Sequence, residues 1–92
     1  MIKSFKGKET EALFNDLRVL TFRAIENQAR RRLLYLNQAK VLLDLRIPPG
    51  NELEALKGDR AGQHSIRINK QWRICFVWRD GDAYDVEIVD YH

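Results

Sequence analysis

The sequence is 92 residues long and has a formal net charge of +3, from 16 Lys and Arg against 13 Asp and Glu. Its 45% hydrophobic and 32% charged residues predict one soluble domain over residues 1–92, because enough apolar surface is present to offset chain entropy. The single cysteine, Cys75, excludes an intramolecular disulfide and is expected to be a small buried residue. With only two histidines besides, we expect neither a metal nor a cofactor. No signal segment and no apolar run of about 18 residues is present, so a cytoplasmic protein without a membrane partner is expected.

The first part of the chain predicts a short strand and two helices. Ile2–Phe5 alternates apolar and polar residues, which favours a short strand. Apolar residues at helical spacing predict a short helix over Glu9–Leu17, unless Asn15-Asp16 ends it early. Thr21 is a suitable N-cap for a longer helix that runs to about Asn37. The apolar arc of that helix would comprise Phe22, Ile25, Ala29, Leu33 and Leu36.

The opposite face of the longer helix gathers positive charge. It carries Arg23, Asn27, Arg30, Arg31 and Leu34, with Arg32 at the border of the apolar arc. Such a face is either a solvated helix surface or a patch whose guanidinium groups bind a nucleic-acid backbone. Composition does not separate the two readings.

A broken region follows the helices. Val41–Leu45 predicts a further helical turn, and Pro48–Asn51 then breaks the chain, because the two prolines remove backbone donors. Leu53–Leu56 predicts a short strand. The charged, glycine-containing stretch Lys57–Gly62 is typical of a loop at the edge of a site.

The last third of the chain predicts consecutive antiparallel strands. They cover His64–Ile68, Gln71–Trp78 and Tyr84–Tyr91, with Asp80-Gly81 as a hairpin turn. The middle strand is apolar on both faces and should be central, with Arg73 near its beginning. The fold class is therefore α+β: a short N-terminal strand, two helices and a mostly antiparallel sheet.

Several polar residues on these strands are not needed for a core. Hairpin-linked neighbours should bring Arg73, the tail Asp90-Tyr91-His92 and Lys57 within reach of one another. Arginine and lysine can stabilise charge on a phosphoryl group, and histidine can transfer protons near neutral pH. Taken singly each residue is usually solvated, but together they suit cleavage of a phosphodiester.

Four stretches carry a resemblance to a known family. They are Leu56–Gly62, Ser65–Arg67, Gln71–Phe76 and Val86–His92. In these stretches the chain resembles the HigB branch of the RelE/ParE superfamily of bacterial toxins, especially its GraT-like members. The resemblance extends over nearly the whole chain, and the terminal Asp-Tyr-His is specific. It implies the RelE-like microbial RNase fold.

The resemblance also implies a function. It is that of a ribosome-dependent mRNA endoribonuclease of a type II toxin-antitoxin system, which inhibits translation and growth. The RNA's own 2′-hydroxyl would attack in the A site of the 30S subunit, giving a 2′,3′-cyclic phosphate without metal. The implied partners are a HigA-type helix-turn-helix antitoxin, the ribosome with its 16S rRNA, and mRNA. Operator DNA would be bound only indirectly, through the antitoxin complex.

Each site residue takes an implied role from its position in the family motif. Arg73 would stabilise the scissile phosphate, and Lys57 would support that charge. His92 would transfer protons, while Asp90 and Tyr91 would orient the substrate and the terminal histidine. For binding ribosomal RNA the candidates are Arg23, Arg30, Arg31, Arg32 and Lys40.

Glu54 departs from the family pattern, because well-studied relatives have a histidine there, three residues before the lysine. It is either a general base or a solvated strand residue, since a carboxylate beside a phosphate opposes binding. A second class of function also stays open: a non-catalytic module that binds the ribosome or the antitoxin. Such a module would inhibit growth by occupancy or act in promoter autoregulation.

Overall fold

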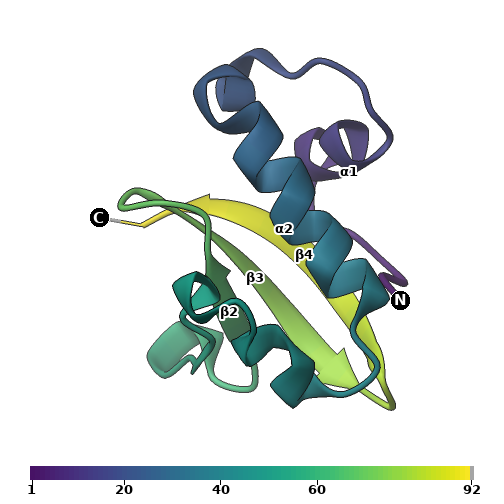
Figure 1. Ribbon diagram of the computed structural model, residues 1–92, viewed down its shortest axis with the longest axis vertical. Helices are drawn as coiled ribbons and strands as arrows, with labels where there is room; N and C mark the ends of the chain where they lie inside the picture. Colours follow the sequence, from purple (N-terminus) through teal and green to yellow (C-terminus); the bar gives the residue numbers. More distant parts are fainter. Residues whose placement is uncertain (92) are drawn as a thin grey trace.

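Two α-helices cover one face of an antiparallel sheet in the computed structural model, which describes residues 1–91 (Figure 1). The helices are α1 (Lys8–Phe14) and α2 (Glu26–Gln38). The sheet has four strands in the order β1-β2-β3-β4 within these residues. They are β1 (Glu54–Ala55), β2 (His64–Arg67), β3 (Trp72–Arg79) and β4 (Asp82–Asp90). The α+β class and the central position of the predicted middle strand are confirmed.

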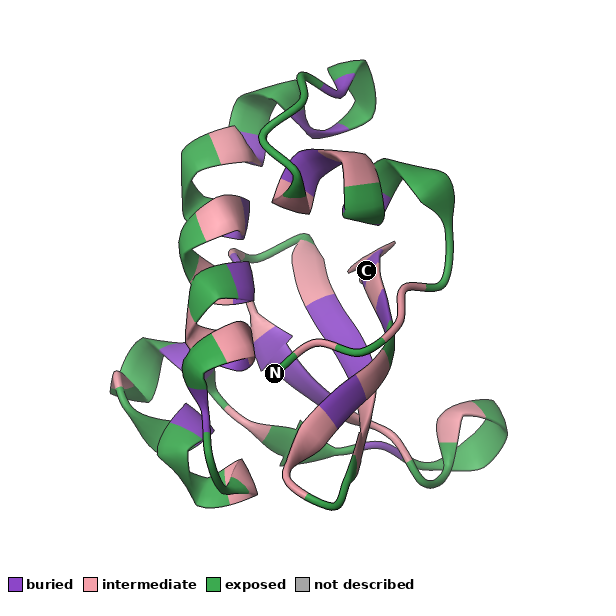
Figure 2. Cartoon of the chain, turned by 90° about the vertical axis from the view of Figure 1, so that its right-hand side faces the viewer, coloured by how far each residue is buried: buried purple, intermediate pink, exposed green. Residues whose placement is uncertain are grey.

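The core lies between α2 and the middle of the sheet. Ala29, Leu33 and Leu36 of α2 have no exposed surface, and neither do Ile74 and Phe76 of β3. Figure 2 shows the buried segments of α2 turned toward the strands. Burial of apolar surface is the main force that holds the two layers together. The predicted apolar arc is confirmed, since its two remaining members are buried as well.

The start of the longer helix differs from the prediction. Leu20–Ile25 forms a 3₁₀ helix, and the α-helix begins only at Glu26. Phe22 and Ile25 are both buried and three residues apart, a spacing that matches the three residues per turn of a 3₁₀ helix. Thr21 is therefore not the helix cap, and its hydroxyl instead donates to the carboxylate of Glu9 at 2.7 Å.

The shorter helix ends early, which was the alternative left open. It stops at Phe14, and the chain turns at Asp16, which is in the left-handed region with φ 66°. The N–H groups of Asn15 and Asp16 still donate to the carbonyls of Glu11 and Leu13. The two residues thus close the helix, as their short polar side chains favour.

Two short 3₁₀ turns connect α2 to the sheet, Leu42–Arg46 and Pro49–Asn51, and a third, Gly58–Arg60, lies between β1 and β2. The N–H groups of Lys40 and Val41 donate to the carboxylate of Asp44 and hold its pKa below the usual range. Asn51 is fully buried, and its amide donates to the carbonyls of Leu45 (3.2 Å) and Ile47 (3.4 Å). These side-chain contacts give an irregular segment a defined path.

The expected N-terminal strand is not confirmed. Within the described residues, Ile2 and Phe5 form isolated parallel bridges with Ala83 and Val86, and no continuous strand joins them. The reason lies in β4, where Asp85 has φ 53° and interrupts the regular pairing. Its N–H is bound by the Ser4 hydroxyl at 2.9 Å instead of by a backbone carbonyl.

The irregularity at Asp85 is a β-bulge, and it changes the alternation of β4. Cys75 pairs with Glu87 and Val77 pairs with Tyr84, so β4 contains one residue more than β3 between these pairs. Ala83 and Val86 are consequently both buried although they are three residues apart. Beyond the bulge, Glu87 and Val89 face away from the helices.

Thr10 offers a test of how α1 is fastened to the sheet. Its side chain is 3% exposed, and its hydroxyl accepts the N–H of Ile88 at 3.1 Å. Thr10→Val keeps the shape but leaves that N–H without an acceptor, so we expect a loss of about 1–3 kcal/mol of stability. Thr10→Ser keeps the hydroxyl and should lose less. Urea unfolding measures both, and an equal loss in the two variants would contradict this role of the hydroxyl.

Candidate active site on the open face of the sheet

One face of the sheet is turned away from the helices and carries polar side chains. Ser65 of β2 pairs with Glu54 of β1 and with Cys75 of β3, which in turn pairs with Glu87 of β4. Directly opposite residues share a face, as do residues two apart along a strand. The part of this surface around Arg73, which we call the open face, comprises Glu54, Ser65, Arg67, Arg73, Cys75, Glu87 and Val89.

Arg73 is half-buried on the open face and is held at two atoms. Its Nε donates to the hydroxyl of Ser65 at 2.8 Å, and its Nη2 donates to the backbone carbonyl of Glu52 at 2.6 Å. Ser65 is fully buried, so the first of these partners is itself fixed by packing. Hydrogen bonds from a charged donor are stronger than those between neutral groups. The guanidinium therefore has a defined orientation.

A second arginine lies directly across from it. Arg67 pairs with Arg73 in the β2–β3 register, and like charges opposite each other are unfavourable in a sheet. The carboxylate of Glu52 lies 3.2 Å from Arg67 Nε and offsets this repulsion. Glu52 thus contacts both arginines, and it has φ 44°, a left-handed conformation that costs about 1 kcal/mol or more in a residue other than glycine. Glu52 is not among the site residues predicted from the sequence, since no local pattern marks it.

The thiol of Cys75 sits among the charges of the open face. Burial raises the pKa of Cys75, against the opposing effect of the Arg60 guanidinium, so the thiol stays protonated at neutral pH. Arg60 pairs with Glu87 at 3.3 Å, and Arg73 and Glu54 also act on the thiol. The expectation of a small buried cysteine is confirmed at 1% exposure. A protonated, enclosed thiol is a poor nucleophile.

The end of β4 is attached to the turn before Arg73. The backbone N–H of Tyr91 donates to the carbonyl of Gln71, whose side-chain amide donates to the carboxylate of Asp90 at 3.1 Å. Asp90 pairs with Trp72 in the register, which places it on the side of the sheet opposite to Arg73. The backbone of the tail is thus bound next to Arg73, while the Asp90 side chain lies on the other side of the sheet and His92 lies outside the described residues.

The remaining candidates on the loop side are more exposed. Glu54 is exposed on β1, opposite Ser65, and so shares the open face with Arg73. Lys57 is exposed at the start of the third 3₁₀ turn. Within residues 1–91 no hydrogen bond or ion pair joins Lys57 to Arg73, so their joint action stays a prediction.

Two of the predicted basic residues, Arg30 and Arg32, make contacts within the protein. Arg30 donates from Nε to the carbonyl of Leu13 at 3.1 Å and from Nη2 to that of Leu17 at 2.8 Å, and it pairs with Glu26. Arg32 is half-buried, and its Nε donates to the carbonyl of Arg67 at 3.3 Å. Both arginines therefore hold the fold together on the helix side.

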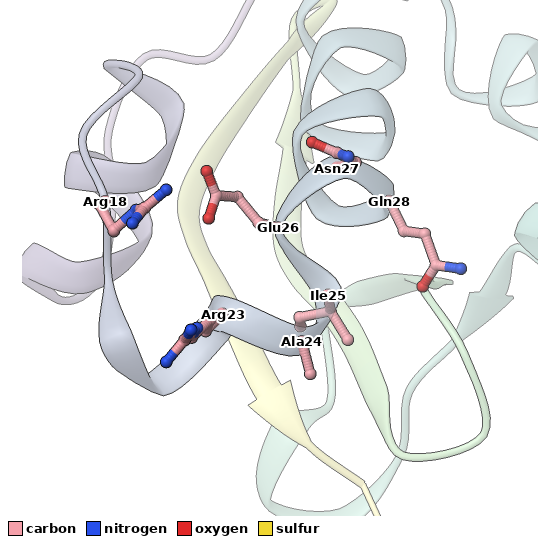
Figure 3. A pocket seen from close by; sticks show the side chains of 7 residues that line it. All are labelled: Arg18, Arg23, Ala24, Ile25, Glu26, Asn27 and Gln28. Atoms are coloured by element: carbon pink, nitrogen blue, oxygen red, sulfur yellow. The ribbon is translucent and has the colours of Figure 1, made fainter.

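The other basic candidates are exposed: Arg23, Arg31 and Lys40. Arg23 belongs to the 3₁₀ helix before α2, and with Arg18 and Glu26 it lines an open hollow of about 460 Å³ (Figure 3). Lys40 follows the end of α2. These side chains are free of the internal contacts of Arg30 and Arg32 within the described residues, and their binding of RNA stays a prediction.

Among residues 1–91, no three His, Cys, Asp or Glu side chains gather closely enough to hold a metal ion. His64 is packed against Phe76 with ring centroids 6.3 Å apart. None of the helices in this part of the chain has the length and apolar composition that a membrane crossing requires.

Known structures share this architecture. A chain of the heterotetrameric YoeB-YefM toxin-antitoxin complex from Staphylococcus aureus matches with a TM-score of 0.63 and 15% identity, covering 100% of this chain and 98% of that one. A second YoeB-YefM complex from the same organism matches with a TM-score of 0.54 at the same identity and coverage. At this identity the likeness concerns the fold alone, which is one found in toxin-antitoxin complexes.

Relatives of higher sequence identity indicate the protein family to which this chain belongs. Toxin HigB-1 of Vibrio cholerae serotype O1 is 45% identical over 85 residues, which is 90% of each chain. Endoribonuclease HigB of Proteus vulgaris is 37% identical over 93 residues, and this match covers 100% of each chain. The family model for the RelE-like toxin HigB of type II toxin-antitoxin systems matches residues 3–92. The chain therefore belongs to the HigB-like family of type II toxins, and the resemblance to HigB is confirmed.

Arg30 and Arg31 give a matched pair of variants on α2. Arg30→Ala removes the donors to Leu13 and Leu17, and we expect a loss of about 1–3 kcal/mol of stability. Arg31→Ala makes the same change at an exposed site of the same helix, so the helix-propensity effect is shared and stability should change by about 0.5 kcal/mol or less. Chemical denaturation measures both. Equal destabilisation would show that the Arg30 contacts add nothing.

Proposed function

We propose that this toxin is an endoribonuclease that cleaves mRNA in the ribosomal A site and so stops translation and growth. The observation that carries this proposal is the anchored Arg73 guanidinium on the open face. Full-length identity of 37% to a protein named Endoribonuclease HigB supports the reaction class. Membership of the type II toxin family supports the effect on growth.

The reaction is an internal phosphoryl transfer in RNA. The 2′-hydroxyl attacks the adjacent phosphorus, and the 5′ oxygen of the next nucleotide leaves. The products are a 2′,3′-cyclic phosphate and a free 5′-hydroxyl, and no metal is required. Negative charge grows on the non-bridging oxygens during attack. Arg73 suits this step because a guanidinium has five N–H donors and the described contacts engage two of them.

Other residues are proposed for charge and proton transfer. Lys57 supplies a second positive charge at the edge of the open face. His92 transfers a proton to or from the reacting oxygens, which an imidazole does well near neutral pH. Tyr91 orients the substrate and the terminal histidine. Asp90 supports the tail through its hydrogen bond with Gln71.

The ribosome is proposed to hold the substrate. A domain of 92 residues is small, so another body is proposed to fix the mRNA against the open face. Exposed Arg23, Arg31 and Lys40 are proposed to contact 16S rRNA through its phosphates. The inward contacts of Arg30 and Arg32 leave them a smaller part in this binding.

The partner that neutralises the toxin is proposed to be a HigA-type helix-turn-helix antitoxin. A type II toxin has a protein antitoxin, and the YoeB-YefM chains with this fold come from toxin-antitoxin complexes. Operator DNA would be bound through the antitoxin, and the toxin itself would act in the cytoplasm, where ribosomes translate. Occupancy of the ribosome without cleavage is the second function, which the following experiment separates.

Arg73→Ala tests cleavage, with Arg79→Ala as its control at the other end of β3. Loss of the donor should lower ribosome-dependent cleavage about 10²–10³-fold. Arg79 stacks over the Tyr84 ring at 4.3 Å, away from the anchored guanidinium, so its variant should retain the activity. Mapping of mRNA 5′ ends after brief expression gives the readout. Growth arrest without cuts in the wild type would favour occupancy, and full cleavage by Arg73→Ala would remove Arg73 from the mechanism.

Glu54 needs a separate test because two readings of it are open. Its exposure on β1 favours the solvated reading, so Glu54→Gln should keep the single-turnover cleavage rate within about threefold. RNA should bind slightly more tightly, since a negative charge is lost near the phosphate. Glu54→His, assayed beside it, restores the side chain of the relatives. A loss of about 10²-fold in Glu54→Gln would instead identify a general base.

A further inference from the structure

Glu52 is the residue on which the two arginines of the open face converge. Its backbone carbonyl accepts Arg73 Nη2 at 2.6 Å, and its carboxylate lies 3.2 Å from Arg67 Nε. It has a left-handed backbone and follows a 3₁₀ turn, with its own N–H bound to the Pro49 carbonyl at 3.1 Å. A strained conformation in a residue other than glycine persists only where surrounding contacts hold it.

The residue before Glu52 is buried and hydrogen-bonded. This residue, Asn51, has no exposed surface and binds the carbonyls of Leu45 and Ile47. This attaches the 3₁₀ turn to the segment before it. The position of the Glu52 carbonyl therefore depends on a buried amide on one side and on the ion pair with Arg67 on the other.

We propose that Glu52 is a positioning residue of the active site: its carboxylate, paired with Arg67, holds residue 52 so that its carbonyl oxygen fixes the Arg73 guanidinium. Without that carboxylate, the repulsion between Arg67 and Arg73 is no longer offset. Arg73 then keeps only the Ser65 hydroxyl and samples other orientations. The catalytic part of this inference rests on the proposed function, and the structural part does not.

The expected effect is on rate and not on stability. The side chains of Arg67 and Glu52 are 36% and 56% exposed, and an ion pair this exposed contributes little to folding. A misplaced guanidinium, in contrast, lowers the rate because the transition-state charge is stabilised only by well-oriented donors. Glu52→Gln keeps the size of the side chain and removes its charge, so it isolates this effect.

The kinetic test uses full-length toxin with programmed ribosomes under single-turnover conditions. We expect Glu52→Gln to lower the cleavage rate at saturation about tenfold, with ribosome affinity unchanged or tighter. Glu11→Gln, an exposed acid of α1, is the control and should not change the rate. In an Arg73→Lys background, Glu52→Gln should have a much smaller effect, because no fork remains to be oriented. An equal effect in both backgrounds, or an unchanged rate in Glu52→Gln alone, would overturn the proposal.

A second measurement does not depend on cleavage. Hydrogen exchange at Arg73 Nη2, the atom that donates to the Glu52 carbonyl, should become several-fold faster in Glu52→Gln when it is followed by NMR, while Arg79 Nη2 is unaffected. Ser65→Ala removes the other anchor and should also speed exchange at Arg73. Unchanged exchange in Glu52→Gln overturns the positioning role whatever the cleavage result. A wild type that cleaves no mRNA overturns the proposed function and the catalytic part of this inference, and exchange alone then decides the structural part.

Discussion

Packing of α2 across the sheet determines where this protein can have a functional surface. The helix places its apolar arc in the same buried core as Ile74 and Phe76, so one face of the sheet is closed. Strand residues alternate between faces, and every second side chain of β2 and β3 must then lie on the other side. Arg67, Arg73 and Ser65 are there for that reason. The bulge at Asp85 shifts the alternation of β4 by one residue, so that Glu87 and Val89 lie on the open face as well.

Arginine has two separate uses in this chain, and the helix pattern does not distinguish them. Arg30 and Arg32 stand on or beside the polar face of α2, yet their long side chains reach back to carbonyl groups of neighbouring segments. Their charge therefore strengthens contacts between elements. Arg31, between them in sequence, stays exposed. The charged group of a long side chain can lie several ångströms from its Cα, so helical periodicity alone does not predict what that group contacts.

The sequence predicted the features that depend on local alternation and turn chemistry. Neighbouring residues are enough to predict the hairpin after β3, the burial of Cys75 and the central position of β3. The features it missed depend on distant partners. At the bulge, the N–H of Asp85 donates to the hydroxyl of Ser4. In the 3₁₀ helix, the Phe22 ring makes an edge contact with the Trp72 ring, with centroids 5.6 Å apart. Glu52 belongs to this second group, since its role exists only once β2 and β3 are paired.

The site depends on the same combination of local and distant contacts. Gln71 binds both Asp90 and the backbone of Tyr91, and it stands two residues before Arg73. The end of β4 and the proposed catalytic arginine are thus joined through one short piece of backbone. Asp90 faces the helix side of the sheet while Arg73 faces the open side, and the hydrogen bond with Gln71 connects Asp90 to the strand that carries Arg73. Ser65 and Glu52 orient the Arg73 guanidinium through hydrogen bonds. The turn at Gln71 fixes the backbone position of Arg73 at the start of β3. A single arginine becomes a directed donor because segments from three parts of the chain meet around it.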